Sequence, residues 1–339
     1  MAALLCVALA FVPLLGSRRQ SVRLPSGEML TLLGVTKGRK PFLYPHSPVS
    51  RLLSSLHLTN GVDLGPLHYP PIRSVNEFYG IYSQSQLLLS NSILMVLRHE
   101  GPTDDFQKII LAPWHPLARA TLADENGEEW ESGLDLSMGI VDLWGFIDFP
   151  RRGGELRLRV YDNSPEQGWR TVVEFKLPNP YRGDYPRWKA TPLPIVAYTN
   201  ELEASLISIS FGLPTWVAEY QPQVWCTKFQ LQLLENGKPS SQWWPRFFHA
   251  VDATGNEWTC HLDKDSEVGG VWQVSVSDRV FSPSEVWRMS FTFVRMEASE
   301  SAALGVTSPY TDDLRTFDFL VQPPTNPPSF KTPFPASSK

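Results

Sequence analysis

A short pattern that occurs twice in the chain predicts two similar folding units. Leu122–Trp130 reads LADENGEEW, and Val251–Trp258 reads VDATGNEW. Each copy places a turn pair, Asn126-Gly127 or Thr254-Gly255, between two extended segments. Asn-Gly tolerates the positive φ angles of a two-residue type I′ turn. We therefore expect two tight β-hairpins with the same register.

The expected register predicts which side chains face one another across each hairpin. Counting outward from the turns places Ala123 opposite Trp130 and Val251 opposite Trp258. The same count pairs two acids in each hairpin, namely Asp124 with Glu129 and Asp252 with Glu257. Because side chains alternate between the faces of a strand, each tryptophan lies on the face opposite these acids. We expect both tryptophans in the core.

Three further segments match in the same order along the chain. The matched pairs are LTLLGVTKG ending at Gly38 with EASLISISFG ending at Gly212, Arg157-Leu158 with Arg288-Met289, and VEFKLPNP from Val173 with FDFLVQPP from Phe317. A repeat of this length indicates two tandem domains, because the units of solenoid proteins are only about 20 to 50 residues long.

The composition is typical of all-β domains. The chain has 339 residues, which suffice for two domains of ordinary size. Its 30 prolines and 22 glycines favour many short strands joined by turns. Glu155–Tyr161 alternates between polar and apolar residues, as does a strand with one wet face. We predict two tandem immunoglobulin-like or jelly-roll-like antiparallel β-sandwiches that arose by internal duplication. Pro48–Leu58 is the best candidate for a helix.

The same patterns divide the chain into five segments. Residues 1–19 are expected to form an export signal or a short membrane anchor, because Ala2–Gly16 is an apolar run shorter than a membrane-spanning helix. The other four are a first β-sandwich at 20–182, a Pro-rich linker at 183–201, a second β-sandwich at 202–324 and a Pro-rich disordered tail at 325–339. We expect an exported protein, either extracellular or in the cell envelope. It would contact a membrane only through an uncleaved N-terminal segment.

Two blocks of the sequence are similar to other proteins. They are LPSGEMLTLLGVTKG from Leu24 to Gly38 and FPRRGGELRLRVY from Phe149 to Tyr161. In these blocks the chain resembles a loose group of uncharacterised exported bacterial β-rich proteins. The resemblance implies export and a β-rich fold, and it assigns neither an activity nor a functional residue.

Charge and motifs argue against several functional classes. The net charge of -5 disfavours nucleic acid and anionic membranes as partners. No Walker loop, GxGxxG, HExxH, GxSxG or CxxC motif occurs. The acid pairs would lie at wet hairpin tips, where a catalytic dyad would lack the cleft that shifts a pKa. We expect no catalytic residue, cofactor or metal. A carbohydrate-active hydrolase with acids on loops is the alternative.

Two cysteines lie in the second predicted domain. In an oxidising compartment Cys226 and Cys260 are expected to form a disulfide, and two buried thiols are the alternative. The expected register also places His249 opposite Cys260. A metal site of these three residues is a weaker interpretation, because their spacing matches no zinc pattern.

An acidic segment, Asp263–Glu267, has the alternating acids of a calcium loop. Val268 stands where an EF-hand needs glycine and Val274 where it needs glutamate, which excludes that motif. A solvated acidic turn is the simpler interpretation. A looser calcium site would instead indicate a calcium-stabilised structural or adhesive protein.

Aromatic residues supply the last candidate site. Trp144 and Phe146 are expected on one strand face with Asp142 and Asp148, and Trp243-Trp244 form a second aromatic pair. Exposed aromatic rings on a flat sheet can stack on sugars or fill the pockets of a protein partner. We therefore expect a non-catalytic interaction module that binds an unknown protein or glycan through these four aromatics. The alternative is that they all belong to the cores.

Overall fold

The chain folds into two compact units, Met1–Asp184 and Tyr185–Lys339. The computed structural model describes residues 20–24, 27, 29–37, 42–44, 61–63, 92–100, 117–131, 134–138, 141–164, 168–213, 225–240, 242–276, 280–296, 310–328 and 331. The expected export segment, the candidate helix and most of the expected tail lie outside these residues. The described residues contain no helix. They therefore include no helix that is long and apolar enough to cross a membrane.

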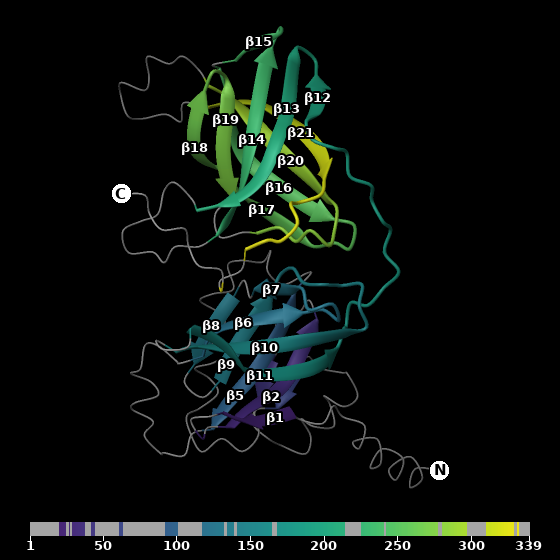
Figure 1. The fold of residues 1–339 in the computed structure, drawn as a ribbon, viewed down its shortest axis with the longest axis vertical. Coiled ribbons are helices and arrows are strands. Elements are labelled where there is room, and N and C mark those ends of the chain that lie inside the picture. Colours follow the sequence, from purple (N-terminus) through teal and green to yellow (C-terminus); the bar gives the residue numbers. More distant parts are fainter. Residues whose placement is uncertain are drawn as a thin grey trace. The chain divides into compact units, whose positions relative to one another are not determined.

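The first unit consists mainly of two antiparallel sheets (Figure 1). The five-stranded sheet has the order β1 (Gln20–Arg23), β2 (Met29–Lys37), β5 (Ile93–Glu100), β9 (Val141–Phe146) and β8 (Leu134–Met138). The four-stranded sheet has the order β11 (Gly168–Pro178), β10 (Glu155–Ser164), β6 (Leu117–Ala123) and β7 (Glu129–Glu131). A short parallel pair, β3 (Phe42–Tyr44) and β4 (Gly61–Asp63), is separate. Side chains of both large sheets form one core, as in a β-sandwich.

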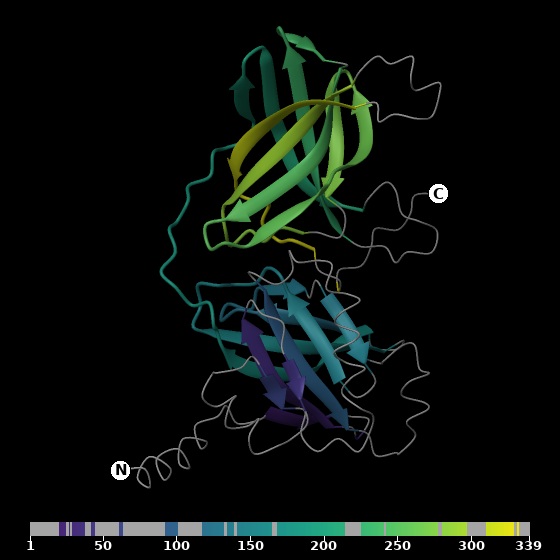
Figure 2. The ribbon, with the colours of Figure 1, turned by 180° about the vertical axis from the view of Figure 1, so that it is seen from behind.

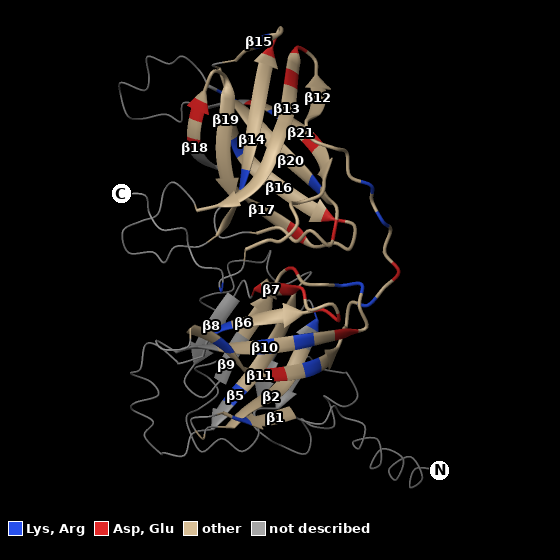
Figure 3. Cartoon of the chain, in the orientation of Figure 1, with Lys and Arg blue, Asp and Glu red and all other residues tan. Residues whose placement is uncertain are grey.

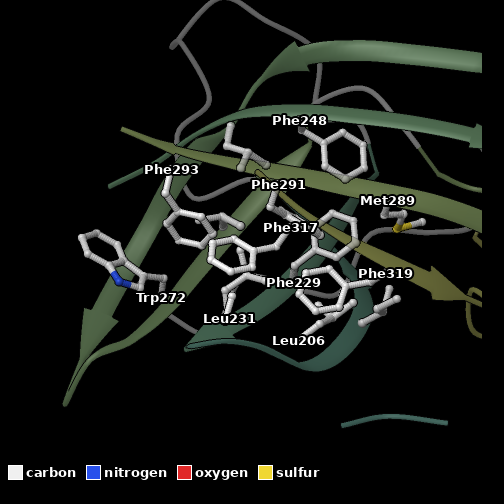
Figure 4. Packing of buried hydrophobic residues seen from close by; sticks show 14 of the residues in the cluster. Leu206, Phe229, Leu231, Phe248, Trp272, Met289, Phe291, Phe293, Phe317 and Phe319 are labelled. Carbon is white, nitrogen blue, oxygen red and sulfur yellow. The ribbon is translucent and has the colours of Figure 1, made fainter. Parts of the chain in front are cut away.

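The second unit is also a β-sandwich. Its first sheet has the order β12 (Ile195–Thr199), β13 (Leu202–Gly212), β14 (Cys226–Glu235), β19 (Val271–Val276) and β18 (Asp263–Val268), with β15 (Lys238–Pro239) also paired to β14. The second has the order β17 (Glu257–His261), β16 (Trp243–Asp252), β20 (Trp287–Met296) and β21 (Tyr310–Val321), and is seen from the other side in Figure 2. The core is rich in phenylalanine and includes Phe229, Phe248 and Phe291 (Figure 4).

The two units have the same strand order in both large sheets. β1-β2-β5-β9-β8 corresponds to β12-β13-β14-β19-β18, and β11-β10-β6-β7 corresponds to β21-β20-β16-β17. Even an irregularity is shared, because the pairing register shifts between Leu32 and Gly34 in β2 and between Leu206 and Ser208 in β13. Descent from a duplicated ancestor, which would account for this agreement, stays a prediction.

All four sequence matches occupy equivalent positions in this topology. Leu158 of β10 pairs with Leu122 and Phe175, and Met289 of β20 pairs with Ala250 and Phe319. These pairings align the hairpins, the Arg157 and Arg288 segments, and the last strands of the two units. The all-β, two-sandwich architecture predicted from the sequence is confirmed.

The repeated hairpins agree with each other, but their turns differ from the predicted type. Asp124 donates its N–H to Glu128 O (3.0 Å), and Asp252 donates to Asn256 O (3.0 Å). Within each three-residue loop only the glycine has a positive φ, at 86° for Gly127 and 88° for Gly255. This geometry is a type I turn followed by a left-handed glycine, not a type I′ turn.

The aspartate that begins each loop explains the longer turn. Asp124 Oδ1 accepts the N–H groups of Asn126 and Glu128, both at 2.9 Å. In the second hairpin Asp252 Oδ1 accepts those of Thr254 (2.8 Å) and Asn256 (3.0 Å). Such side-chain bonds to the backbone favour turns over continued strand pairing.

The predicted cross-strand partners are therefore wrong by one residue. Trp130 lies opposite Leu122 and Trp258 opposite Ala250, while Glu129 lies opposite Ala123 and Glu257 opposite Val251. The aspartates do not face these glutamates. The prediction that the tryptophans point inward is confirmed, because Trp130 is buried and Trp258 packs against the second core.

The Pro-rich segment 183–201, expected to be a linker, is partly structural. Ile195–Thr199 forms β12 and pairs with β13 along its whole length. Before it, Thr191 donates its N–H to Leu320 O of β21 (2.9 Å). The second unit therefore begins before Leu202. Residues 195–199 extend one of its sheets, and Thr191 is hydrogen-bonded to the edge strand of the other, although the prolines predicted a linker here.

Candidate functional site

The four aromatics predicted to form a binding face lie in or against the cores. Trp144, Phe146 and Trp243 are 2%, 0% and 3% exposed. Trp244 is half-buried, and its ring centroid lies 5.2 Å from that of Trp272. The prediction of an exposed aromatic face is wrong. In β9 the register decides this, since Trp144 lies opposite Met95, a core residue.

The predicted disulfide is also absent. Cys226 lies on β14 and donates its thiol to Gly212 O (3.3 Å), whereas Cys260 lies on β17 and packs against the core from the other sheet. Both residues are thiols. Thr259, not Cys260, lies opposite His249, so the weaker metal interpretation loses its geometry. Among the described residues, no three potential ligands are grouped to hold a metal ion.

The acidic segment predicted to be a turn or a calcium loop is instead strand β18. Asp265 is the extra residue at a register shift between Lys264 and Ser266. Its carboxylate lies 3.1 Å from Lys228 Nζ, and its side chain is 2% exposed. Ser275 donates a further hydrogen bond to Asp265 at 3.2 Å. This acid therefore has a structural role, joining β18 to β14 across β19.

In the first unit the outer face of the four-stranded sheet carries an ion network. Arg159 Nη1 lies 2.7 Å from Glu129 Oε1, and Arg159 Nε lies 2.9 Å from Glu174 Oε2. Tyr161 donates its hydroxyl to the same oxygen of Glu129 at 2.8 Å. Burial lowers the pKa of Arg159, but the hydrogen bonds to Glu174 and Glu129 outweigh burial and raise it above the usual arginine range. The network fixes the sheet surface by giving Arg159 two carboxylate partners on two other strands of the sheet.

Residues at the start of the FPRRGGELRLRVY block also have a structural role. Arg151 is buried, with its guanidinium 4.6 Å from the ring centroid of Phe149 and 4.8 Å from that of Tyr181. Asn179 donates its amide to Pro150 O (3.0 Å) and Gly153 O (2.9 Å). These contacts close one end of the first sandwich.

An exposed polar surface lies on the second unit, on the outer face of its β12-β13-β14-β19-β18 sheet. Two neighbouring rows of side chains cross the strands: Val196, Ser205, Gln232, Val271 and Val268, and then Ser208, Gln230, Gln273 and Ser266. We call these nine residues the Ser/Gln face. All except Ser205 are half-buried or exposed. Their strand neighbours, such as Leu231 and Trp272, point the other way into the core.

The equivalent surface of the first unit is buried, with the polar residues Thr31 and Arg98 at the places of Ser205 and Gln232. β5 holds the place of β14, and Leu94, Met95 and Val96 are all at most 3% exposed. β5 is therefore buried on both faces. Val96, the counterpart of Gln230, is apolar and buried, whereas Gln230 is polar and exposed. Since the two units share their topology, the fold does not require a polar surface here.

The Ser/Gln face is uncharged, and the described charged residues beside it lie at its margins. Figure 3 shows no charge over the middle of β14 and β19. Glu203 lies on β13 in the next row on one side, opposite Tyr198. Lys228 lies in the next row on the other side, where it pairs with Asp265.

The sequence carries a signal of this site, although the site was not predicted from it. The words FQLQLL, from Phe229 to Leu234, and VWQVSV, from Val271 to Val276, alternate polar and apolar residues over parts of two strands. Each word alone is typical of any half-exposed strand. Only the pairing of β14 with β19 shows that their glutamines and serines form one surface.

Comparisons with known proteins add little. No protein-family model matches the sequence. No curated protein matches it either. Two solved structures of pullulanase from Anoxybacillus sp. LM18-11, one complexed with maltotriose, are each 14% identical over 60% of this chain and 22% of theirs. The chain thus spans about a fifth of the pullulanase length. Their TM-scores, 0.17 and 0.16, are too low to bear on fold or function.

Proposed function

We propose that the protein is an exported, non-catalytic interaction module that holds a protein or glycan ligand on the Ser/Gln face of its second unit. The apolar run Ala2–Gly16, which has the length of a signal peptide, supports export. The observation that carries binding is the contrast between the units. At equivalent positions, β5 is buried on both faces while β14 presents Gln230 and Gln232 on one face.

The geometry favours binding over catalysis. The face is made of adjacent strands of one sheet, and its polar groups are amides and hydroxyls, which recognise ligands but are poor general acids and bases. A hydrolase of the glycosidase type needs two carboxyl groups flanking a bond, at separations of about 5 to 10 Å. No Asp or Glu belongs to the Ser/Gln face.

A charge-insertion variant tests the proposal. The full chain and its Gln230→Lys, Gln232→Lys double variant would be labelled and applied to arrays of polysaccharides, glycoproteins and purified surface proteins. We expect spots that retain the wild-type chain to lose the double variant, because two lysines would place charge in the middle of an uncharged surface. The control is Thr316→Lys, at an exposed position on the other sheet.

Two results would contradict the proposal. One is equal retention of the wild type and the double variant on every spot that binds. The other is release of new reducing ends from a polysaccharide by the purified wild-type protein, which would favour the hydrolase alternative.

A further inference from the structure

We infer that the ligand of the Ser/Gln face is an uncharged polysaccharide chain lying across the strands, with Tyr198 at one end. The inference rests on the proposed function and narrows its ligand to one chemical class.

The side chains of the face suit the hydroxyl groups of a sugar. The hydroxyl of serine both donates and accepts hydrogen bonds, and the amide of glutamine has two donors and an acceptor. Sugar hydroxyls have the same dual character. Ser208 already donates to Gln230 Oε1 at 2.9 Å, which restrains the Gln230 side chain before a ligand arrives. A restrained side chain loses less conformational entropy on binding.

The shape of the face suits an extended chain. The row from Val196 to Val268 crosses five strands. At about 4.8 Å between neighbouring strands, this row is about 19 Å long. The second row, from Ser208 to Ser266, runs beside it. The surface is therefore long and narrow, as an oligosaccharide of several rings would require.

Aromatic and apolar groups lie at the ends of the face. Tyr198, on edge strand β12, is 71% exposed. Its ring can lie against the apolar face of a sugar while its hydroxyl stays in water. Val196 and Val268, at opposite ends of one row, are 43% and 77% exposed. The apolar groups thus flank the polar middle of the face.

This distribution disfavours a protein partner. Protein interfaces have aromatic and apolar anchors at the centre and a polar rim, and serine is rare among the residues that dominate their binding energy. Here the order is reversed, with Ser205, Gln232 and Gln230 between apolar edges.

The charges that border the Ser/Gln face disfavour acidic polysaccharides. An acidic chain would need cations, but Lys228, a described cation that borders the face, is already paired with Asp265 at 3.1 Å. On the other border Glu203 would repel uronate or sulfate groups. The net charge of the chain, -5, acts in the same direction. An uncharged polysaccharide meets neither obstacle.

The test is affinity electrophoresis of the full chain through gels that contain one polysaccharide each. The neutral probes would be a glucan, a mannan, a xylan and a galactan, and the acidic probes alginate and polygalacturonate. We expect retardation by at least one neutral probe. The Gln230→Ala, Gln232→Ala double variant should weaken that binding about tenfold, the effect of losing about 1.4 kcal/mol of hydrogen bonding. Tyr198→Ala should weaken it comparably, and Thr316→Ala should leave it unchanged.

Three outcomes overturn the inference. Tighter binding to alginate or polygalacturonate that the same variants weaken would show an acidic ligand, and the proposed function would stand. Retention on purified protein spots but in no polysaccharide gel would show a protein ligand, again on the proposed face. Neutral binding that none of the face variants changes would place the ligand elsewhere, and then the proposed function fails as well.

Discussion

Glu129 and Glu257 hold the same position in the two repeated hairpins but have different surroundings. Glu129 accepts hydrogen bonds from Arg159 and Tyr161, and its side chain is only 17% exposed. Glu257 Oε1 lies 2.9 Å from His249 Nε2, and the Glu257 side chain is 54% exposed. An exposed ion pair contributes little to stability, whereas a partly buried network loses more when one partner is removed.

We predict that Glu129→Gln destabilises the first unit by about 1 to 3 kcal/mol, because Arg159 and Tyr161 lose a charged acceptor. Glu257→Gln serves as the matched control and should change stability by less than about 0.5 kcal/mol. Urea unfolding followed by circular dichroism would measure both. A loss for Glu129→Gln as small as the one expected for the control would mean that the Arg159 network is not stabilising.

The two cysteines of the second unit, Cys226 and Cys260, should behave as thiols. Cys226 and Cys260 lie on different sheets, and their side chains are not bonded to each other. We predict that reductant leaves the melting temperature of the oxidised protein unchanged, because no cross-link constrains the unfolded chain. Mass spectrometry after alkylation in denaturant should find both cysteines modified. A disulfide-linked peptide would contradict the structure.

Among the elements, the repeated hairpins depend on a glycine and not on the Asn-Gly pair as a whole. Only Gly127 and Gly255 adopt positive φ in their loops. A type I′ turn does occur elsewhere, between β14 and β15, where Asn236 and Gly237 have φ of 51° and 73°. In the repeated hairpins the capping aspartates produce the three-residue loop. Between β14 and β15 the two-residue connection produces the type I′ turn.

We predict that Gly127→Ala and Gly255→Ala each destabilise their unit by about 1 to 2 kcal/mol, the cost of a left-handed non-glycine residue. Asn126→Ala should cost less than about 0.5 kcal/mol, because Asn126 needs no positive φ. Chemical denaturation of the three variants provides the measurement. If Asn126→Ala costs as much as Gly127→Ala, the loop is a type I′ turn after all.

For the whole molecule, the two units have separate hydrophobic cores. Every buried residue of one core lies between Leu24 and Tyr181, and every one of the other between Leu202 and Val321. Phe291, at the centre of the second core, has its ring 5.1 Å from those of Phe229 and Phe248. Leu158 is fully buried in the first core.

We predict that Phe291→Ala destabilises the second unit by about 3 to 5 kcal/mol and leaves the first unit unchanged. Leu158→Ala should do the reverse, at about 2 to 5 kcal/mol. Differential scanning calorimetry would show two transitions, each lowered by one of the variants. A single transition that both variants lower equally would mean that the units unfold cooperatively.

The sequence by itself determined the fold class, the presence of two similar units and the inward direction of Trp130 and Trp258. These follow from turn residues, alternation and repetition, which are local properties of the chain. It also placed Asp124 and Asp252 at the turns, although it did not show that their carboxylates would lengthen the loops by one residue.

For Trp144 and Gln230, only the tertiary structure decided which face of the strand is buried. Trp144 and Gln230 both lie in alternating segments, and alternation defines two faces without saying which one meets the opposite sheet. Pairing with β5 directs Trp144 into the first core, and pairing of β14 with β19 leaves Gln230 and Gln273 outside the second. The candidate site therefore could not be found along the chain, because each of five strands contributes only one or two of its residues and only the sheet brings them together.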